Sequence, residues 1–504
     1  MHNILVRRAQ INHSHKGDHR AILRDIARRA MLERGLLPDF SPEALVQLDG
    51  IGLPARAGGA GVRDLRGLPW ASIDNDDSRD LDQLTAARDL GGGNVSVLVA
   101  VSDVDALVKM DSPLDRHARH NTTSVYTPAM VFPMLPGKLS EGLTSLNQDE
   151  DRLAIVMEMT VGADGSVRNY DIYEAAVRNR AKLAYNSLAA WLEGAGPVPA
   201  RALAVSGLEE NLLLQDRTAQ KMKRRRHEHG ALSLKTVEAS PRFEQDVVID
   251  LDIRAKTRAN DLIEDFMIAA NSAASRFLAA RGLPSLRRVV RRPQRWDRIV
   301  ELAKEQGCAL PKSPDAVALE HFLTEAQAKD ALGFPDLSLS IIKLLGPGEY
   351  AADIPGEKQW DGHFSLAVRG YSHSTAPNRR FPDLITQRLL KAALAKTEIP
   401  APYSATGLEE LAAHCTREED AAKKVERRVG KSAAALLFES RIGQRFDSIV
   451  TGAGPKGTWV RLLHPPVEGK VVSGYQGLDV GHRVRVRLVH VDVEAGFIDF
   501  ERSG

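Results

Sequence analysis

The hydrophobic positions near the start of the chain are spaced for helices. Over residues 17–35, apolar side chains recur every three or four positions, and a glycine closes the pattern. A second short helix is expected after Ser41, because serine caps helix N-termini and a proline follows it here. The stretch 56–61, rich in glycine and alanine, is typical of a linker. These features predict a small helical domain over residues 1–58, for which a helix-turn-helix arrangement is one candidate.

From residue 62 onward, strand patterns and helix patterns come in separate runs. Two β-rich segments surround the Gly-Gly-Gly-Asn sequence 91–94, which indicates a hairpin, and further strands are expected at 152–161 and 167–172. Because strands and helices do not alternate regularly, the pattern predicts an α+β fold with one large domain over residues 62–438. The helices of this domain are expected at 187–192, 208–223, 261–281, 298–305 and 381–394.

The final segment, residues 442–504, returns to short strands separated by glycine and proline turns. Strands of this length over about sixty residues are typical of a small barrel, so we expect a five-stranded OB-fold domain here. Four of its strands are expected at 446–451, 458–463, 483–491 and 496–500.

The charge balance limits the possible classes of protein. The chain has 504 residues, 43% of them hydrophobic, with 68 lysines and arginines against 66 aspartates and glutamates. This composition excludes a wholly disordered chain and argues against a uniformly basic scaffold, so any nucleic-acid affinity has to come from local clusters. Two basic runs, 221–226 and 287–292 with Arg295, could line an RNA channel. A solvated helix end is an equally good interpretation of each run.

The two cysteines and the hydropathy pattern bear on the cellular compartment. Cys308 and Cys415 stand far apart, so neither a disulfide framework nor a cysteine zinc site is supported, and a reducing, cytoplasmic location fits best. The N-terminus lacks the apolar core of a signal peptide, and no stretch provides about eighteen consecutive apolar residues. We therefore expect a protein that is neither secreted nor membrane-spanning.

A run of acidic residues is the most informative feature of the chain. Five aspartates fall within the nine residues 74–82, in a loop that enters the first β-rich segment. Carboxylates this close repel one another unless cations neutralise them. Asp80 and Asp82 face the same side of an extended segment, and a turn could bring Asp74 to meet them. Such oxygen ligands suit magnesium or manganese, although a solvated acidic loop explains the spacing equally well.

The acidic run resembles the catalytic signature of the ribonuclease II/ribonuclease R (RNB) family of 3′-to-5′ exoribonucleases. In that signature an aspartate is followed by further aspartates six, eight and nine residues later. Asp74, Asp80 and Asp82 match the first three positions, and Gln83 stands at the fourth. Glutamine offers a carbonyl oxygen but no charge, so this departure bears on the occupancy of a second metal position.

Three further stretches resemble blocks of the same family, in the family's order. Where the family has an arginine after Ser-Pro-Ile, this chain has Arg379 after Asn378, so the resemblance assigns phosphate contact to Arg379. A guanidinium suits that role because it stays charged and can bind phosphate through two donors. The alternatives are a surface arginine that caps a helix, or Arg380 in the same role. With the acidic run, the matching blocks cover roughly residues 62–435; they are 112–147, 262–271 and 370–384.

The resemblance implies a metal-dependent enzyme that hydrolyses RNA processively from a single-stranded 3′ end and releases nucleoside 5′-monophosphates. Magnesium is the implied cofactor, with manganese as an alternative, and no obligate protein partner is implied. The implied catalytic residues are Asp82, Arg379 and Glu426, and the implied metal ligands are Asp74, Asp80, Asp82 and Gln83. The implied RNA-contacting residues are Tyr126, Tyr185, Glu264 and Arg380.

Two aromatic residues of the predicted barrel, Trp459 and Tyr475, are candidates for stacking on bases, while other aromatics are expected to fill its core. A second stacking aromatic of the family is expected near 230–234, where this chain has only aliphatic residues. Two other functions stay open. The first is a catalytically weak RNA-binding protein, which the replacement at Gln83 would allow. The second is a deoxyribonuclease, because selection against DNA depends on contacts to the 2′-hydroxyl that a sequence does not show.

Overall fold

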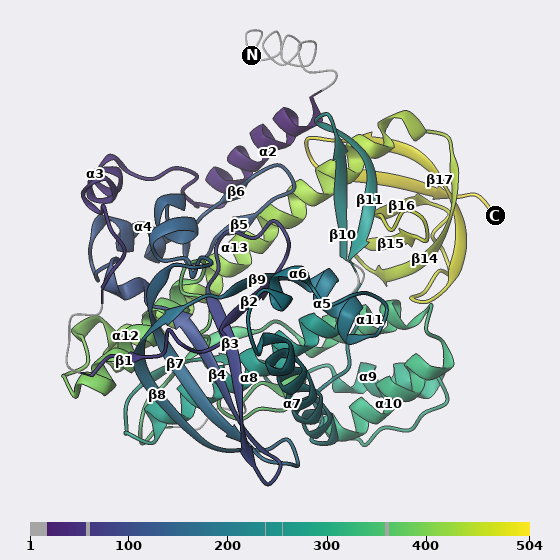
Figure 1. The fold of residues 1–504 in the computed structure, drawn as a ribbon. Helices are drawn as coiled ribbons and strands as arrows, with labels where there is room; N and C mark the ends of the chain where they lie inside the picture. The colour runs from purple at the N-terminus through teal and green to yellow at the C-terminus, as the bar shows by residue number, and fades with distance from the viewer. Residues whose placement is uncertain (1–17, 57–60, 237, 255, 358–361) are drawn as a thin grey trace.

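The computed structural model describes residues 18–56, 61–236, 238–254, 256–357 and 362–504 (Figure 1). The two expected N-terminal helices are present. Helix α2 (His19–Glu33) is capped by the side chain of Asp18, and α3 (Pro42–Gly50) is capped by Ser41. Helix α2 lies along the long helix α13 (Ala405–Phe438), whereas α3 packs against α4 (Pro113–Asn121). Residues 1–17 of the predicted first domain and residues 57–60 of the predicted linker lie outside the described residues.

A seven-stranded mixed sheet forms the centre of the large domain. The predicted hairpin is its middle pair, and the glycines of its turn have the positive φ values that a tight connection requires. The four longest strands are antiparallel, and the short strands β1 and β9 join parallel to their neighbours. The strand order is β1 (Arg63–Asp64), β8 (Val167–Arg178), β7 (Asp151–Val161), β4 (Asn94–Ser102), β3 (Gln83–Gly91), β2 (Ala71–Asp74) and β9 (Ala181–Ala184).

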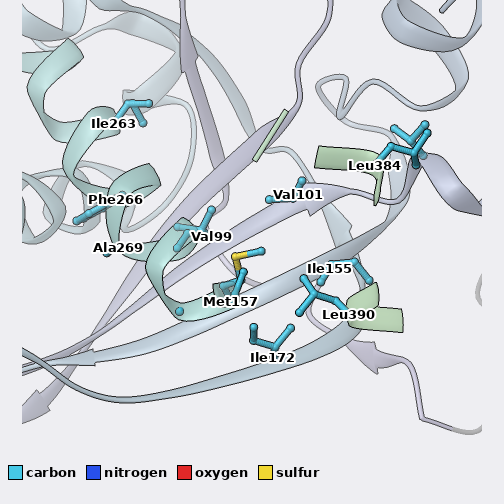
Figure 2. Close-up of a cluster of buried hydrophobic side chains, with 14 of the residues drawn as sticks. Val99, Val101, Ile155, Met157, Ile172, Ile263, Phe266, Ala269, Leu384 and Leu390 are labelled. Atoms are coloured by element: carbon cyan, nitrogen blue, oxygen red, sulfur yellow. The ribbon is translucent and has the colours of Figure 1, made fainter. Parts of the chain in front are cut away.

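The two faces of the sheet are both covered, so the central strand β4 is buried from Val95 to Ser102. Val99 and Val101 of β4 pack with Met157 of β7 against Phe266 of helix α8 (Arg258–Ala279), as Figure 2 shows. The alternate residues of β4 face a second, smaller cluster around Trp70. The helices on the first face also include α5 (Tyr185–Leu192), α7 (Leu208–Glu228) and α12 (Phe381–Ala395).

Other elements surround this core. Two short strands, β5 (Val125–Tyr126) and β6 (Val131–Phe132), follow α4, and a short π-helix covers Lys138–Leu143. A separate apolar cluster joins three helices of the second half of the domain, around Trp296 and Phe322. The remaining elements are α6 (Ala200–Leu203), β10 (Glu238–Glu244), β11 (Val247–Arg254), β12 (Ser285–Val289), α9 (Trp296–Glu305), α10 (Ala316–Lys329), α11 (Phe334–Leu345) and β13 (Glu349–Asp353).

The C-terminal segment is a closed five-stranded barrel, as the OB-fold prediction requires. Its apolar interior is continuous with the end of α13 and with α2, because Phe446 contacts both Phe438 of α13 and Phe500 of the barrel, with ring centroids 5.4 and 6.4 Å apart. The barrel is therefore seated on the large domain by shared core packing. Its strands are β14 (Arg445–Gly454), β15 (Gly457–Leu462), β16 (Glu468–Ser473), β17 (Arg483–Asp492) and β18 (Phe497–Arg502).

The α+β class is confirmed, because the mixed sheet, the helices around it and the separate barrel do not form a regular βαβ alternation. Among the helices that the structure describes, none is both long enough and apolar enough to span a bilayer.

Candidate active site

The acidic run forms the connection between two sheet strands. Strand β2 ends at Asp74, and β3 begins at Gln83. Between them Leu81 is buried in the cluster under the sheet, and the backbone carbonyl of Asp82 accepts the N–H of Ser102 at the end of β4. The loop is thus anchored next to Asp82, whose side chain is only 2% exposed. An acidic loop that enters a strand was expected, but a solvated loop does not describe Asp82.

Asp82 is bound to the loop that carries the candidate arginine. Its Oδ1 accepts the backbone N–H of Asn378 at 2.9 Å, and its Oδ2 lies 3.3 Å from Nε of Arg379. Burial raises the pKa of Asp82 to about 7, against the opposing effects of the Arg379 charge and the Asn378 N–H. A buried carboxylate held beside one guanidinium has a negative charge that a cation would stabilise further.

Tyr126 connects the acidic loop with helix α13. Its hydroxyl donates to Oδ2 of Asp80 at 3.0 Å, and its backbone N–H donates to Oε1 of Glu426 at 2.8 Å. Burial raises the pKa of Glu426, so this residue is not one of the solvated glutamates of its helix. The Tyr126 side chain is still 43% exposed, which leaves part of it accessible to a ligand.

Tyr185 and Asp74 belong to the same group of side chains. Tyr185 is the first residue of α5, and its phenol is close enough to Asp74 and Arg379 for both charges to act on its pKa, which burial raises. The pKa of Asp74 is raised first by burial, and the neighbouring Asp80 charge adds to the effect. The structure thus brings Asp74, Asp80, Asp82, Tyr126, Tyr185, Arg379 and Glu426 to one place.

Glu264 and Gln83 are placed differently. Glu264, on α8, is paired with Lys256, whose Nζ lies 2.5 Å from its Oε2. Gln83 is paired with Val101 across the β3–β4 ladder. Because successive side chains of an extended strand point to opposite faces, Gln83 leaves the backbone away from the side of Asp82. A metal-ligand role for Gln83 stays a prediction.

Arg380, the alternative to Arg379, makes a structural contact. It is the N-cap residue of α12, and its Nη2 donates to Oδ1 of the fully buried Asp383 at 2.8 Å. Arg379 instead points to Asp82 and keeps 41% of its side chain exposed. The geometry therefore favours Arg379 over Arg380 for contact with a phosphate.

The donor set can be tested against a divalent metal. Within the described part of the chain, no three His, Cys, Asp or Glu side chains are arranged so that they could hold a metal ion by themselves. Magnesium nevertheless binds commonly through one or two carboxylates, with water and substrate phosphate as the other ligands. Asp80 lies close enough to Asp74 and to Asp82 for its charge to raise the pKa of both. The carboxylate oxygens fit magnesium or manganese on this basis.

Sequence reasoning missed the polar network around Asn378. Its side chain accepts a hydrogen bond from Oγ1 of Thr144 at 2.6 Å and donates one to Oγ of Ser102 at 3.1 Å. Asn378 is fully buried. The signal was available, because an asparagine at a position where the resembled motif has an isoleucine needs hydrogen-bond partners if it is buried.

The two basic runs are mostly neutralised by ion pairs. In the first run, Arg225 binds Asp164 at 3.0 Å, and Lys223 and Arg226 also have carboxylate partners. In the second run, Arg288 binds Glu419 at 2.6 Å, and Arg287 and Arg291 are paired as well. The sequence alone left an RNA channel and a solvated helix end equally open, and these pairs show that most of the charge is matched within the fold.

The barrel presents its two candidate aromatics on the outside. Trp459 alternates with the inward-facing Thr458 and Val460 of β15, and it lies over Gly452, where an added Cβ would be 3.5 Å from the ring. Tyr475 is 43% exposed in the turn after β16. Phe446, in contrast, is a core residue of the barrel.

Comparison with known proteins agrees with this fold. The RNB domain model matches residues 62–396, and the model of the RNase II-type exonuclease C-terminal S1 domain matches residues 444–503. The chain therefore belongs to the RNB family, which confirms the resemblance. Ribonuclease R of Escherichia coli strain K12 is 32% identical over 477 residues, which cover 88% of this chain and 57% of that protein. Ribonuclease R of Aquifex aeolicus is 30% identical over 469 residues, 87% of this chain and 64% of its own length.

Solved structures extend the comparison of the fold. Mycoplasma genitalium RNase R in complex with ribose-methylated single-stranded RNA has a TM-score of 0.86 and 20% identity, over 95% of this chain and 77% of that one. Yeast Ssd1, described as a pseudonuclease, has a TM-score of 0.67 and 17% identity, over 87% of this chain and 54% of that one. At these identities the likeness shows the fold alone. This chain spans between about half and two thirds of the length of the curated relatives it matches.

Proposed function

We propose that this chain is a divalent-metal-dependent 3′-to-5′ exoribonuclease that hydrolyses RNA processively to nucleoside 5′-monophosphates. The observation that carries the proposal is the contact between Asp82 and the Asn378–Arg379 segment, beside Asp74 and Asp80. This arrangement combines carboxylates that suit a metal with a partly exposed guanidinium that can reach a phosphate.

Each residue of the site has a role in the proposed reaction. Asp74, Asp80 and Asp82 would hold magnesium or manganese, which when bound would supply an activated water and neutralise phosphoryl charge. Arg379 binds the non-bridging oxygens of the scissile phosphate, because its side chain is held at Asp82 yet stays accessible. Glu426 and Asp80 fix the position of Tyr126 from two sides, at its backbone and at its hydroxyl.

Single-stranded RNA is the proposed substrate, entered from its 3′ end. The exposed face of Tyr126 is available to stack on a base, and Tyr185, which is close to Asp74, is proposed to contact the last nucleotide. Glu264 is proposed as a ribose contact, and Trp459 and Tyr475 add base contacts outside the barrel core. The Mycoplasma RNase R structures with single-stranded and double-stranded RNA support RNA as the ligand class.

We further propose a division into residues 1–58, a catalytic domain over 62–438 and an RNA-binding barrel over 442–504, working in the cytoplasm without an obligate protein partner. The buried thiol of Cys415 is compatible with a reducing compartment.

A catalytically weak RNA-binding protein is the second candidate, because a pseudonuclease shares the fold and Gln83 replaces an aspartate of the signature. The three aspartates and the Asp82–Arg379 contact favour the enzyme.

One experiment separates these functions. Equal amounts of uniformly labelled RNA with a single-stranded 3′ tail, blunt duplex RNA and matching DNA are incubated with magnesium, manganese or EDTA, with an excess of unlabelled RNA added after binding. The proposal predicts mononucleotides from tailed RNA with either metal, without a ladder of intermediates, and no reaction in EDTA. RNA binding without hydrolysis would support the second candidate, and equal hydrolysis of DNA would remove the specificity for RNA.

A further inference from the structure

A cavity of about 380 Å³ lies apart from the acidic loop. Part of its wall is the segment His363–Arg369, and the start of α10 forms another part, at Pro314 and Ala316. None of the proposed catalytic or metal-binding residues lines it. The other lining residues are His229 and Arg292.

The cavity carries unmatched positive charge. Arg292 and Arg369 are exposed, and neither makes an ion pair or hydrogen bond with another residue that the structure describes. This contrasts with the neighbouring Arg287 and Arg288, whose guanidinium groups are both paired with carboxylates. Among the lining residues that the structure describes, none has a carboxylate. Asp315, between two of them, caps α10 by accepting the N–H of Ala318.

Part of the cavity wall is apolar. Phe364, Ala367, Val368 and Pro314 contribute to it, and the Phe364 ring is held in an edge contact with Trp296, with centroids 6.5 Å apart. An apolar wall beside two guanidinium groups suits a ligand with a flat ring and an anionic group. The volume is also in the range of small-molecule sites. The start of α10 adds the positive end of a helix dipole to the same rim.

The cavity is connected to the active-site loop by the chain itself. The His363 ring contacts Tyr371, and Tyr371 contacts His373, with centroids 5.5 and 5.6 Å apart. A few residues further along the same segment is Arg379, the candidate phosphate ligand. Gly362, with φ of +84°, allows the backbone at Val368 to pack against it, because a Cβ there would lie 2.4 Å from the carbonyl oxygen of Val368.

We propose that this cavity is a second nucleotide-binding site, in which Arg292 and Arg369 bind a phosphate group and the apolar residues of the wall contact a base. Two sources share this chemistry: a nucleotide of an RNA strand away from its 3′ end, and a free nucleoside 5′-monophosphate. RNA and its mononucleotide product are named as sources because of the proposed function. The proposed affinity for a nucleotide phosphate does not depend on that function.

The test uses the full chain in EDTA, so that no RNA is consumed. Binding of AMP, adenosine, inorganic phosphate and a short single-stranded RNA is measured by calorimetry for the wild type and for Arg292→Ala/Arg369→Ala. The control is Arg295→Ala, which removes an exposed arginine of the same segment that does not line the cavity. Arg369→Glu is a second variant, since an exposed side chain tolerates charge reversal without loss of the fold.

A free-nucleotide site predicts that AMP binds more tightly than adenosine, and that the double variant and Arg369→Glu each weaken AMP at least tenfold while Arg295→Ala does not. If the cavity binds an RNA strand instead, the double variant and Arg369→Glu each weaken RNA binding at least tenfold and leave AMP binding unchanged. Unchanged binding of AMP, phosphate and RNA in both cavity variants would overturn the proposal. Hydrolysis of tailed RNA with magnesium is scored separately, so loss of the proposed function and loss of this site are distinguishable.

Discussion

The backbone N–H of Asn378 donates to the Asp82 carboxylate at 2.9 Å, although 296 residues separate the two in the sequence. The Asn378 side chain is held in turn by Thr144 and Ser102, inside the protein. The position of Arg379 relative to Asp82 is therefore set by a buried amide, and the chemistry of the site depends on a residue that need not touch substrate.

Asn378→Ile tests this positioning role. The variant loses both side-chain hydrogen bonds, so we expect kcat on tailed RNA to fall roughly ten- to a hundredfold while RNA affinity changes little. Single-turnover rates and equilibrium binding measure the two effects separately. Thr144→Val removes the donor from the other side and should give a smaller loss that is not additive with Asn378→Ile, whereas Thr144→Ser should be silent. A wild-type rate in Asn378→Ile would contradict the role.

Asp82→Asn tests the metal site. The substitution keeps the shape of the side chain but removes its charge, so we expect hydrolysis to be lost and RNA binding to remain. The matched controls are Asp76→Asn and Asp77→Asn, which remove exposed aspartates of the same loop. A rate assay over a range of magnesium concentrations compares Asp82→Asn with the two control variants. Turnover near that of the wild type in Asp82→Asn, or equal losses in the controls, would remove Asp82 from the proposed ligands.

Local patterns predicted part of the fold. The expected helices and strands are present because each has an apolar periodicity that its own sequence shows, whereas other elements, such as α10, α11 and β10 to β13, were not expected. Strand β16 was missed because it contains Gly469, which weakens a strand signal. A Cβ at Gly469 would lie 2.3 Å from the Phe500 ring, so the barrel core requires glycine at this position.

The site could be predicted only in part. The acidic run and the arginine motif identified its two halves, since each is contiguous in sequence. The contacts that join distant segments have no local signal, as for Tyr126 and Glu426, which are 300 residues apart. The basic runs were left undecided for the same reason, because their carboxylate partners come from other elements of the fold.

Trp459→Ala tests the barrel as an RNA-binding surface. Stacking of one base on an aromatic ring contributes about 1–3 kcal/mol, so we expect RNA affinity to fall about five- to a hundredfold with kcat unchanged. Phe446→Ala is the contrasting variant, because its ring packs between Phe438 and Phe500 and its loss should lower stability. Equal RNA affinity in Trp459→Ala and wild type would show that this face does not bind RNA.

His117 gives a pH-dependent prediction. It is buried on α4 beside the Phe40 ring, at a centroid distance of 4.2 Å, and burial lowers its pKa to about 4 from 6.5. Between pH 4 and pH 6.5, the His117 side chain binds a proton in the unfolded chain but not in the folded chain. Its contribution to stability is therefore full above pH 6.5 and is lost as pH falls towards 4, by about 2–3 kcal/mol. In urea titrations, the stability difference between wild type and His117→Leu should shift by that amount between pH 7.5 and 4.5. A stability difference that stays constant between pH 7.5 and pH 4.5 would contradict the lowered pKa of His117.

Arg379→Lys tests the proposed phosphate contact. Lysine keeps the positive charge but loses the planar pair of donors, so a group that acts mainly in the transition state should lose rate rather than affinity. We expect kcat to fall roughly ten- to a thousandfold, as for removal of one preorganised donor, with a much smaller change in RNA binding. Single-turnover measurements on tailed RNA at saturating enzyme give the rate directly.

Arg380→Lys is the matched control, and its expected result follows from its different contact. Arg380 occupies the N-cap position of α12, and its side chain binds the buried Asp383. Its replacement should therefore lower the free energy of unfolding while leaving the rate per folded molecule within a few fold of wild type. Thermal unfolding of both variants beside the rate assay separates the two effects. If Arg379→Lys kept the wild-type rate and Arg380→Lys lost it, the phosphate contact would belong to Arg380, and the Asp82–Arg379 pair would have a structural role only.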